Sequence, residues 1–292
     1  MKVDSVTESQ EIEKYRSLMV GLAYRLVGSV VEAEDIVQEA FIKWLHTDKN
    51  TIRSLKSWLY TVTTRLALDY LKSAKVKRES YIGPWLPEPY IHDSRSPDSL
   101  YEMDESISMA LLVVLERLTL LERGAYILHD IFNFNYVGIA EILNQSIENC
   151  RQLVSRARKK IKTTKSPYSP NQEEYLELTD AFFQAIKKGD MDQLIAVLSD
   201  KVTFHADGGG KAVAADDILS GTQEVAEFLM KKISRPLNGK GATLKNVWFN
   251  GSPGVVLAFK SRAVTAFNFV IEDNKILKIH AMRNPDKLSR FG

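Results

Sequence analysis

The 292-residue sequence has one cysteine, no long apolar run and almost no net charge. Its single cysteine, Cys150, excludes an internal disulfide. No apolar run approaches the roughly 18 residues that a membrane-spanning helix needs, and the N-terminus lacks a signal-peptide pattern. These absences predict a cytoplasmic protein without a membrane partner. Because the formal net charge is only +2, any strongly basic surface must be local.

The sequence also lacks the residue spacings of common cofactor and metal sites. Its five histidines are scattered, and no arrangement of His, Cys or carboxylate residues matches a zinc site. The glycine-rich segment 206–211, ADGGGK, lacks the spacing of a phosphate-binding loop. We therefore expect no metal and no cofactor. Cys150 falls on the apolar face of a predicted helix, which favours a buried thiol over a reactive one.

Basic residues are concentrated between residues 148 and 165, where seven Lys or Arg stand against one acidic residue. Residues 134–161 are predicted to form two short helices around a turn at Asn144 and Gln145. Ser146 can cap the second helix by accepting a hydrogen bond from the Asn149 amide. A short helix, a tight turn and a basic helix are typical of a helix-turn-helix reader of DNA.

The second of these helices has an apolar face and a basic face. The apolar face comprises Ile147, Cys150, Val154, Ala157 and Ile161. The residues expected to contact DNA are Arg151, Gln152, Ser155, Arg156 and Lys159. Arginine can bridge a guanine edge through two hydrogen bonds, glutamine can pair with adenine, and lysine can hold phosphates. The alternative is a solvated basic helix without a partner.

The N-terminal part of the chain is predicted to be entirely helical. One buried helical face is expected from Ile12, Tyr15, Leu18, Met19, Leu22 and Leu26, and a second from Ile36, Val37, Ala40, Phe41, Trp44 and Leu45. The second of these helices groups acidic and amide residues on its outer side, namely Glu34, Asp35, Gln38 and Glu39. That patch is either a partner-binding surface or a solvated face.

A third helix is predicted from Ser54 to about Ser73. Its buried side is expected to comprise Leu55, Leu59, Val62, Leu66 and Tyr70. Its other side presents hydroxyls and cations, at Thr61, Thr64, Arg65 and Lys72, and continues into Lys75. Such a stripe, with Trp58 and Tyr60 nearby, indicates contact with a nucleic-acid backbone and with unstacked bases.

Prolines interrupt the chain twice. Residues 80–99 contain YIGPWLPEPY, whose three prolines exclude a regular helix and favour an extended linker. Trp85 and Leu86 are apolar residues that a solvated tether does not need, so we expect them to dock on a surface. The second break, residues 163–172, precedes a domain of different character.

The last domain is predicted to be α+β, with helices followed by a curved antiparallel sheet. The predicted strands are residues 202–206, 243–249, 254–260, 264–272 and 276–282. Folds of this type host enzymes, and His205, Asp207 and His280 are the candidate acid-base groups. We expect instead that Asp207 holds its glycine-rich loop through side-chain hydrogen bonds.

Two helical DNA-facing modules in this order resemble the extracytoplasmic-function (ECF) sigma factors, the promoter-recognition subunits of bacterial RNA polymerase. AEDIVQEAFIKWL, residues 33–45, resembles region 2.2, which docks on the polymerase β′ subunit. SLKSWLYTVTTRLALDYLKSAKVKR, residues 54–78, resembles regions 2.3 and 2.4, which melt and read the minus-10 element. The basic helix is similar to region 4.2, which reads the minus-35 element. The resemblance implies two partners, the polymerase core (β′ and β) and promoter DNA.

The resemblance also assigns residues to these contacts. It implies contacts with the polymerase core at Asp35, Gln38 and Glu39. It implies minus-10 contacts at Thr61, Arg65, Lys72 and Lys75. The implied minus-35 contacts are Arg151, Gln152, Ser155, Arg156 and Lys159.

The last domain resembles the SnoaL-like branch of the NTF2-like fold, a cone whose sheet wraps a cavity. Together, WLPEP, DGGGK and NPDKL resemble the ECF41 group, sigma factors whose fused SnoaL-like extension modulates activity in cis. The resemblance implies regulatory contacts between domains at Trp85, Leu86, Pro87, Asp207, Gly208, Gly209, Gly210, Lys211, Asn284, Pro285, Asp286, Lys287 and Leu288. What the extension senses stays open, including an unidentified small ligand in the cavity.

The predicted architecture is multidomain: two all-α sigma domains, a region 2 bundle and a region 4 helix-turn-helix, and an α+β cone. The expected boundaries are 1–80 for region 2, 81–105 for a linker, 106–163 for region 4, 164–171 for a second linker, 172–283 for the SnoaL-like domain and 284–292 for the tail. We expect a sigma factor and not an enzyme. Two alternatives remain open: a ligand-sensing or repressor-type DNA-binding regulator, and a C-terminal domain with cyclase or isomerase activity.

Overall fold

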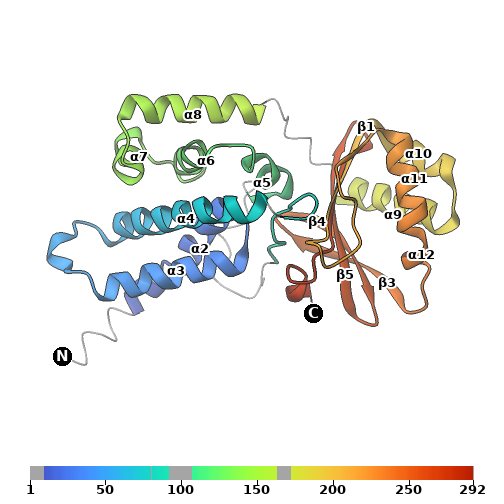
Figure 1. Cartoon of the computed structure of the whole chain (residues 1–292), viewed down its shortest axis with the longest axis horizontal. Helices are drawn as coiled ribbons and strands as arrows, with labels where there is room; N and C mark the ends of the chain where they lie inside the picture. The colour runs from blue at the N-terminus through green and yellow to red at the C-terminus, as the bar shows by residue number, and fades with distance from the viewer. Residues whose placement is uncertain (1–9, 80, 92–106, 163–171, 292) are drawn as a thin grey trace. The chain divides into compact units, whose positions relative to one another are not determined.

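The computed structural model describes residues 10–79, 81–91, 107–162 and 172–291, without the side chains of residues 75–79 and 172. The chain forms two compact units (Figure 1), which we call the first unit (Met1–Glu79 with Asp93–Lys165) and the second unit (Ser80–His92 with Ser166–Gly292). The proline-rich linker segment therefore packs with the C-terminal residues. Within the described ranges, no helix is long and apolar enough to cross a membrane.

The N-terminal part of the first unit contains the helices α2 (Arg16–Val27), α3 (Val30–Leu45) and α4 (Leu55–Glu79), with a short 3-10 helix at Lys49–Thr51. Gly28 ends α2 in the left-handed conformation, at φ 72°, and Ser29 caps α3 by accepting a hydrogen bond from the Glu32 amide. The predicted apolar faces of α2 and α3 are largely buried. Leu45 is an exception, because 45% of it is exposed at the end of α3.

Helix α4 is buried along a different stripe from the predicted one. Leu59 is buried as expected, but the other four predicted residues are only half-buried. The buried residues of α4 are Leu59, Tyr60, Thr63, Thr64, Ala67, Leu68, Leu71 and Ala74. The reason is that α4 packs against α2 and α3 and also against α6 and α7. A helix covered on two sides buries a wider arc than the single stripe that its periodicity predicts.

The rest of the first unit contains the predicted helix-turn-helix. Its helices are α5 (Met109–Leu115), α6 (Leu120–Tyr126), α7 (Tyr136–Leu143) and α8 (Ile147–Lys162), with a π-helical turn at Ile127–Ile131. The turn at Asn144 is left-handed, and the Asn149 amide donates to Ser146 Oγ at 3.1 Å, which confirms the predicted cap. Cys150 is buried as predicted, and burial raises the pKa of its thiol.

The second unit is an α+β domain, as predicted. Its helices are α9 (Gln172–Lys188), α10 (Met191–Val197), α11 (Thr222–Lys232) and α12 (Ser234–Leu237). Its strands are β1 (Leu198–Asp207), β2 (Leu219–Ser220), β3 (Ala242–Phe249), β4 (Ser252–Phe259), β5 (Arg262–Glu272) and β6 (Lys275–Met282), in the sheet order β2-β1-β6-β5-β4-β3. The sequence patterns had not indicated α11, α12 or β2.

The prediction of an antiparallel sheet is wrong for one pair of strands. β1 and β6 run parallel, with Asp207 opposite Met282. Three successive reversals, through β3, β4, β5 and β6, bring the last strand back beside the first. The periodicity of a sequence predicts a strand but not the strand that it pairs with, so the sequence did not predict that β1 pairs with β6. Its consequence is that the residues after β6 begin beside the end of β1.

Aromatic rings pack between the sheet and the helices in the core of the second unit. Phe182 and Phe183 of α9 contact Phe267 and Phe269 of β5 edge-to-face, with ring centroids 5.3–6.0 Å apart. Phe204 of β1 contacts Phe228 of α11 in the same cluster. These side chains belong to one buried apolar cluster between the sheet and its helices.

Candidate nucleic-acid interface and linker-binding site

The basic face of α8 surrounds a hollow of about 450 Å³ in the first unit. Its lining residues are Tyr136, Arg151, Ser155, Arg158, Lys159 and Lys162. All five residues predicted to contact the minus-35 element are exposed on α8, and three of them, Arg151, Ser155 and Lys159, line the hollow. A concave surface of this charge suits a phosphate backbone and base edges.

Tyr136, Arg158 and Lys162 are hollow residues that were not in the predicted set. The Arg151 guanidinium lies 5.6 Å from the centroid of the Tyr136 ring, a cation–π distance. Arg158 Nε donates to both carboxylate oxygens of Asp130, at 2.9 and 3.1 Å, and this pairing raises the pKa of Arg158. Arg158 and Lys162 lie within the basic run, whereas no local pattern pointed to Tyr136 of α7.

Gln152 and Arg156 lie outside the hollow. Arg156 Nε is 3.4 Å from a carboxylate oxygen of Glu122, whose other oxygen accepts a hydrogen bond from Lys160 Nζ at 2.6 Å. Burial of Glu122 opposes ionisation, but Lys160 and the Thr119 hydrogen bonds outweigh it and hold the pKa of Glu122 below its usual value. Arg156 nevertheless keeps 53% of its side chain exposed.

The residues predicted to contact the polymerase core lie on the exposed side of α3. Asp35, Gln38 and Glu39 are all exposed. Gln38 accepts a long hydrogen bond of 3.5 Å from Arg16, and Glu39 pairs with Lys43 at 3.2 Å. Exposed ion pairs of this kind contribute little to stability, so this surface remains available to a partner.

The predicted minus-10 residues on α4 differ in their surroundings. Arg65 donates from Nε to Ile142 O at 3.0 Å and from Nη2 to Glu141 O at 2.9 Å, at the end of α7. Thr61 donates to Ser57 O, and Lys72 pairs with Asp69. The Lys75 side chain lies outside the described residues.

Tyr60 is buried, although the sequence predicted it near unstacked bases. Its ring contacts Phe132 and Phe134 edge-to-face, at 5.6 and 4.8 Å between centroids. Burial raises the pKa of Tyr60 to about 12. In this conformation, Tyr60 of α4 packs against the residues just before α7, and Arg65 of α4 donates hydrogen bonds to α7 itself.

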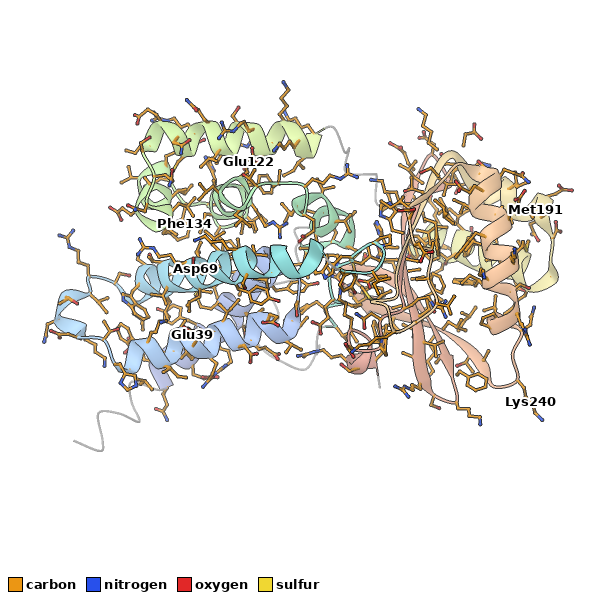
Figure 2. All side chains as sticks on the ribbon, viewed as in Figure 1. Glu39, Asp69, Glu122, Phe134, Met191 and Lys240 are labelled. Atoms are coloured by element: carbon orange, nitrogen blue, oxygen red, sulfur yellow. The ribbon has the colours of Figure 1, made fainter. Side chains whose placement is uncertain are left out.

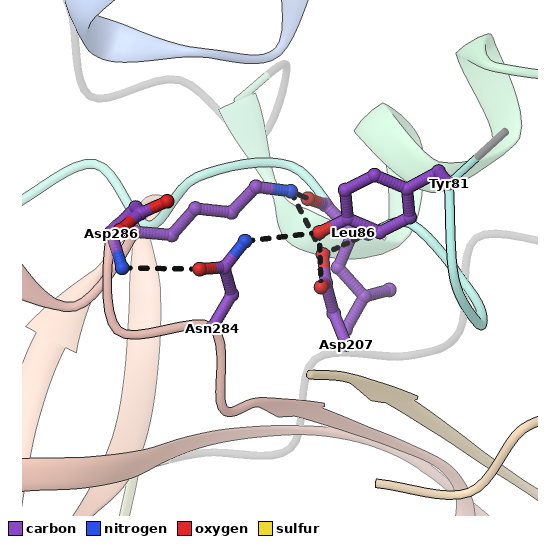
Figure 3. Close-up of polar contacts among 6 residues, drawn as sticks. Tyr81, Leu86, Asp207, Asn284 and Asp286 are labelled. Carbon is purple, nitrogen blue, oxygen red and sulfur yellow. Dashed lines mark hydrogen bonds and ion pairs between the residues drawn. The ribbon is translucent and has the colours of Figure 1, made fainter. Parts of the chain in front are cut away.

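In the second unit, Asp207 lies at the end of β1 with no exposed surface (Figure 3). Its Oδ1 accepts a hydrogen bond from Tyr81 Oη at 2.6 Å. Its Oδ2 accepts from Leu86 N and from Lys287 Nζ, both at 2.8 Å. The expectation that this carboxylate holds its own glycine-rich loop is therefore wrong, because it binds the linker and the tail.

The tail completes this cluster, which we call the linker clamp (Tyr81, Leu86, Asp207, Asn284 and Lys287). Lys287 Nζ also donates to Leu86 O at 2.6 Å. The same ammonium lies 4.3 Å from the centroid of the Trp85 ring. Asn284 Nδ2 donates to Tyr81 Oη at 3.0 Å (Figure 3). Three segments far apart in sequence thus share one buried carboxylate.

The glycine-rich loop allows this close approach. A Cβ on Gly209, which has φ +60°, would lie 2.3 Å from Asn284 Nδ2. A Cβ on Gly208 would lie 2.3 Å from Ala212 O, and one on Gly210 would lie 2.9 Å from Ile82. At the rim, Lys211 and Asp286 form an exposed ion pair. Pro87 and Leu288 are buried, Pro285 is half-buried, and the predicted regulatory residues therefore lie together within the second unit.

The candidate acid-base residues of the second unit are all buried. His205 and His280 face each other across β1 and β6, with ring centroids 5.3 Å apart. Burial, with smaller effects of His205 and Lys278, lowers the pKa of His280 well below its usual value. Asp207, the third candidate, has its carboxylate committed to three donors.

Comparisons with known proteins agree with this arrangement. Residues 12–76 match the family model of sigma-70 region 2, and residues 108–161 match that of sigma-70 region 4. The chain is 34% identical over 292 residues to the ECF RNA polymerase sigma factor SigJ of Mycobacterium tuberculosis, covering 97% of this chain and 93% of SigJ. It is 35% identical over 277 residues to the probable sigma factor SigI of the same species, covering 94% and 92%.

A helix-turn-helix module, a region 2 bundle and a fused α+β unit define a class of protein, the promoter-recognition subunits of RNA polymerase. The chain belongs to the ECF RNA polymerase sigma factors, and it acts in transcription initiation. The crystal structure of M. tuberculosis SigJ resembles it along the whole chain, with a TM-score of 0.76 and 33% identity over 96% of this chain and 98% of that one.

We expect Arg151→Ala to weaken discrimination at the minus-35 element by about 1–3 kcal/mol, because a lost bidentate contact removes one base preference. Fluorescence anisotropy with matched and minus-35-substituted duplexes measures it. Lys162→Ala, in the same hollow, is the control and should weaken binding evenly across sequences. An even loss with Arg151→Ala would make Arg151 a phosphate contact instead.

We expect Asp207→Asn to lower the free energy of unfolding by about 3–5 kcal/mol, because it leaves the Lys287 ammonium without its buried partner. Urea unfolding of the full chain, followed by circular dichroism, measures the change. Lys211→Met breaks the exposed pair with Asp286 and should cost less than about 1 kcal/mol. Equal effects of the two substitutions would contradict the central role of Asp207.

Proposed function

We propose that the second unit regulates this sigma factor in cis by holding the linker between regions 2 and 4. The observation that carries the proposal is the buried Asp207 carboxylate, whose two oxygens bind Tyr81, the Leu86 amide and Lys287. The linker runs from the end of α4 to the start of α5. Each linker residue held on the second unit removes about 3.5 Å from the reach of the tether. Capture therefore limits how far the two DNA-reading modules can separate.

Linker capture is energetically coupled to the tail. A buried carboxylate is stable only while its hydrogen bonds and its counter-charge are present. Release of the linker removes two of the three donors to Asp207 and also the carbonyl that Lys287 binds. The tail and the linker should therefore be held or released together.

The first unit supports a second part of the proposal, a closed state in which region 4 covers residues of region 2. Arg65 donates to two carbonyls of α7, and Tyr60 is buried against Phe132 and Phe134. Both α4 residues lie in the segment assigned to minus-10 recognition. Reading of that element then requires α4 to part from α7.

The proposal also assigns the contacts with the polymerase core and with promoter DNA. Asp35, Gln38 and Glu39 bind the polymerase core, and Thr61, Arg65, Lys72 and Lys75 bind the minus-10 element. The exposed basic face of α8, including Gln152 and Arg156, binds the minus-35 element. The second unit acts through contacts and not through catalysis, because its acidic candidate is committed to structural hydrogen bonds. Regulation is assigned to the linker because the Asp207 carboxylate binds it directly, through Tyr81 and the Leu86 amide.

We expect truncation after Arg283 to release the linker and to change transcription from matched promoters with core polymerase. Chymotrypsin provides a direct readout, because Trp85 and Tyr90 become cleavable once residues 81–91 leave the second unit. Lys211→Met in the full-length chain is the control and should protect the linker as the wild type does. A truncated chain with wild-type protection and wild-type transcription would refute the regulatory proposal.

We expect Phe134→Ala to loosen the closed first unit, because it removes an edge-to-face contact with Tyr60 worth about 0.5–1.5 kcal/mol beyond its buried area. Energy transfer between labels on α4 and α8 should report a longer mean distance. Val137→Ala on α7, where Val137 is 53% exposed, is the matched control. An unchanged distance in a folded Phe134→Ala chain would contradict the closed-state proposal.

A further inference from the structure

Charge is segregated along the second unit. Residues 172–227 contain twelve acidic and four basic residues, whereas residues 228–271 contain seven basic residues and no acidic one. The whole chain carries a net charge of only +2, so this separation is invisible in the overall composition. A local excess of basic residues creates a positive potential at the nearby surface. Acidic residues elsewhere in the chain do not cancel this potential at short range.

The fold gathers most of these cations at one end of the unit. We call this surface the basic pole, comprising Lys231, Lys232, Arg235, Lys240, Lys260 and Arg262, all exposed. The end of α11, the short helix α12, the loop that carries Lys240 (Figure 2) and the β4–β5 turn meet there. The Lys260 amide donates to Gly241 O at 3.3 Å, which ties the turn to the loop. Asn238 Nδ2 donates to Lys187 O, which adds the end of α9.

The helix dipole explains only part of this surface. Lys231 and Lys232 lie in the last turn of α11, where cations are favourable. That explanation does not extend to Lys240, Lys260 or Arg262, which lie in a loop and beside a turn. Among the described residues, none of these three has a carboxylate within ion-pair distance.

The β4–β5 turn gives an independent indication. Lys260 and Ser261 both have positive φ, 49° and 67°, a conformation that favours Asn, Asp or Gly. The other two hairpin turns of the same sheet use such residues, Asn250-Gly251 and Asp273-Asn274. A lysine of the basic pole is thus held in a strained backbone conformation. Strain of this kind is typical of functional positions.

We propose that the basic pole binds the phosphate backbone of duplex DNA, as a contact additional to the minus-10 and minus-35 modules. Lysine and arginine side chains on an exposed surface neutralise phosphates without reading bases. DNA is the favoured polyanion because a sigma factor works on it. The contact would be independent of sequence and would weaken steeply with salt.

The test uses the full chain in an Arg151→Ala, Lys159→Ala background, which reduces binding by α8, and a labelled duplex without promoter elements. Lys240→Gln, Lys260→Gln and Arg262→Gln are added together, and affinity is measured from 50 to 200 mM salt. The slope of log affinity against log salt should become shallower by about 2–3, because each neutralised phosphate contributes about 0.9. An unchanged slope would overturn the proposal.

Two controls separate charge from folding and DNA from other anions. Lys260→Asn relieves the turn, so it should keep or raise the melting temperature while it reduces the slope by about 1. Lys240→Arg with Lys260→Arg keeps the charges and should bind as the parent does. Loss of binding to phosphatidylserine vesicles with no change on DNA would assign the pole to a lipid surface and overturn the proposal. Chymotrypsin protection at Trp85 reports linker capture separately, so failure of one proposal does not imply failure of the other.

Discussion

The second unit depends on how it accommodates one fully buried negative charge. A carboxylate removed from water is stable only with a counter-charge and with hydrogen bonds to its remaining lone pairs. For Asp207 these come from a linker tyrosine, a linker amide and a tail lysine. No residue of its own loop replaces them. The stability of the second unit therefore depends on the conformation of the linker, which connects regions 2 and 4.

The same logic explains why the glycine-rich loop and the proline-rich linker belong together. The prolines keep the linker extended, so its Leu86 amide and carbonyl are not used in a helix. The amide binds Asp207 and the carbonyl binds Lys287. The glycines remove the Cβ atoms that would block Asn284 and Ile82 from approaching the loop. The glycine-rich loop and the proline-rich linker are each unusual in sequence, and each provides space or hydrogen-bonding groups that the other uses.

How much could be predicted from the sequence differs between the two units. The helix-turn-helix was readable down to the Ser146 cap, because caps and apolar stripes are local. The buried residues of α4 could not be predicted from the sequence, because they depend on helices that pack against α4 from two sides. The resemblance placed Asp207, Leu86 and Lys287 in one regulatory set. The ion pair between Asp207 and Lys287 could be identified only in the three-dimensional structure. Tyr136 and the strained Lys260 were missed since neither belongs to a local pattern.

The parallel pairing of β1 with β6 has a consequence for the order in which the protein matures. The strand that carries Asp207 pairs with β6, which is synthesised after it, and Lys287 follows β6 in the chain. Domains of a growing chain fold largely in the order in which they emerge. Regions 2 and 4 precede β6 in the sequence, so both can fold before the linker can make these contacts. During synthesis the linker therefore lacks its contacts with Asp207 and Lys287 until β6 and the residues that follow it have left the ribosome.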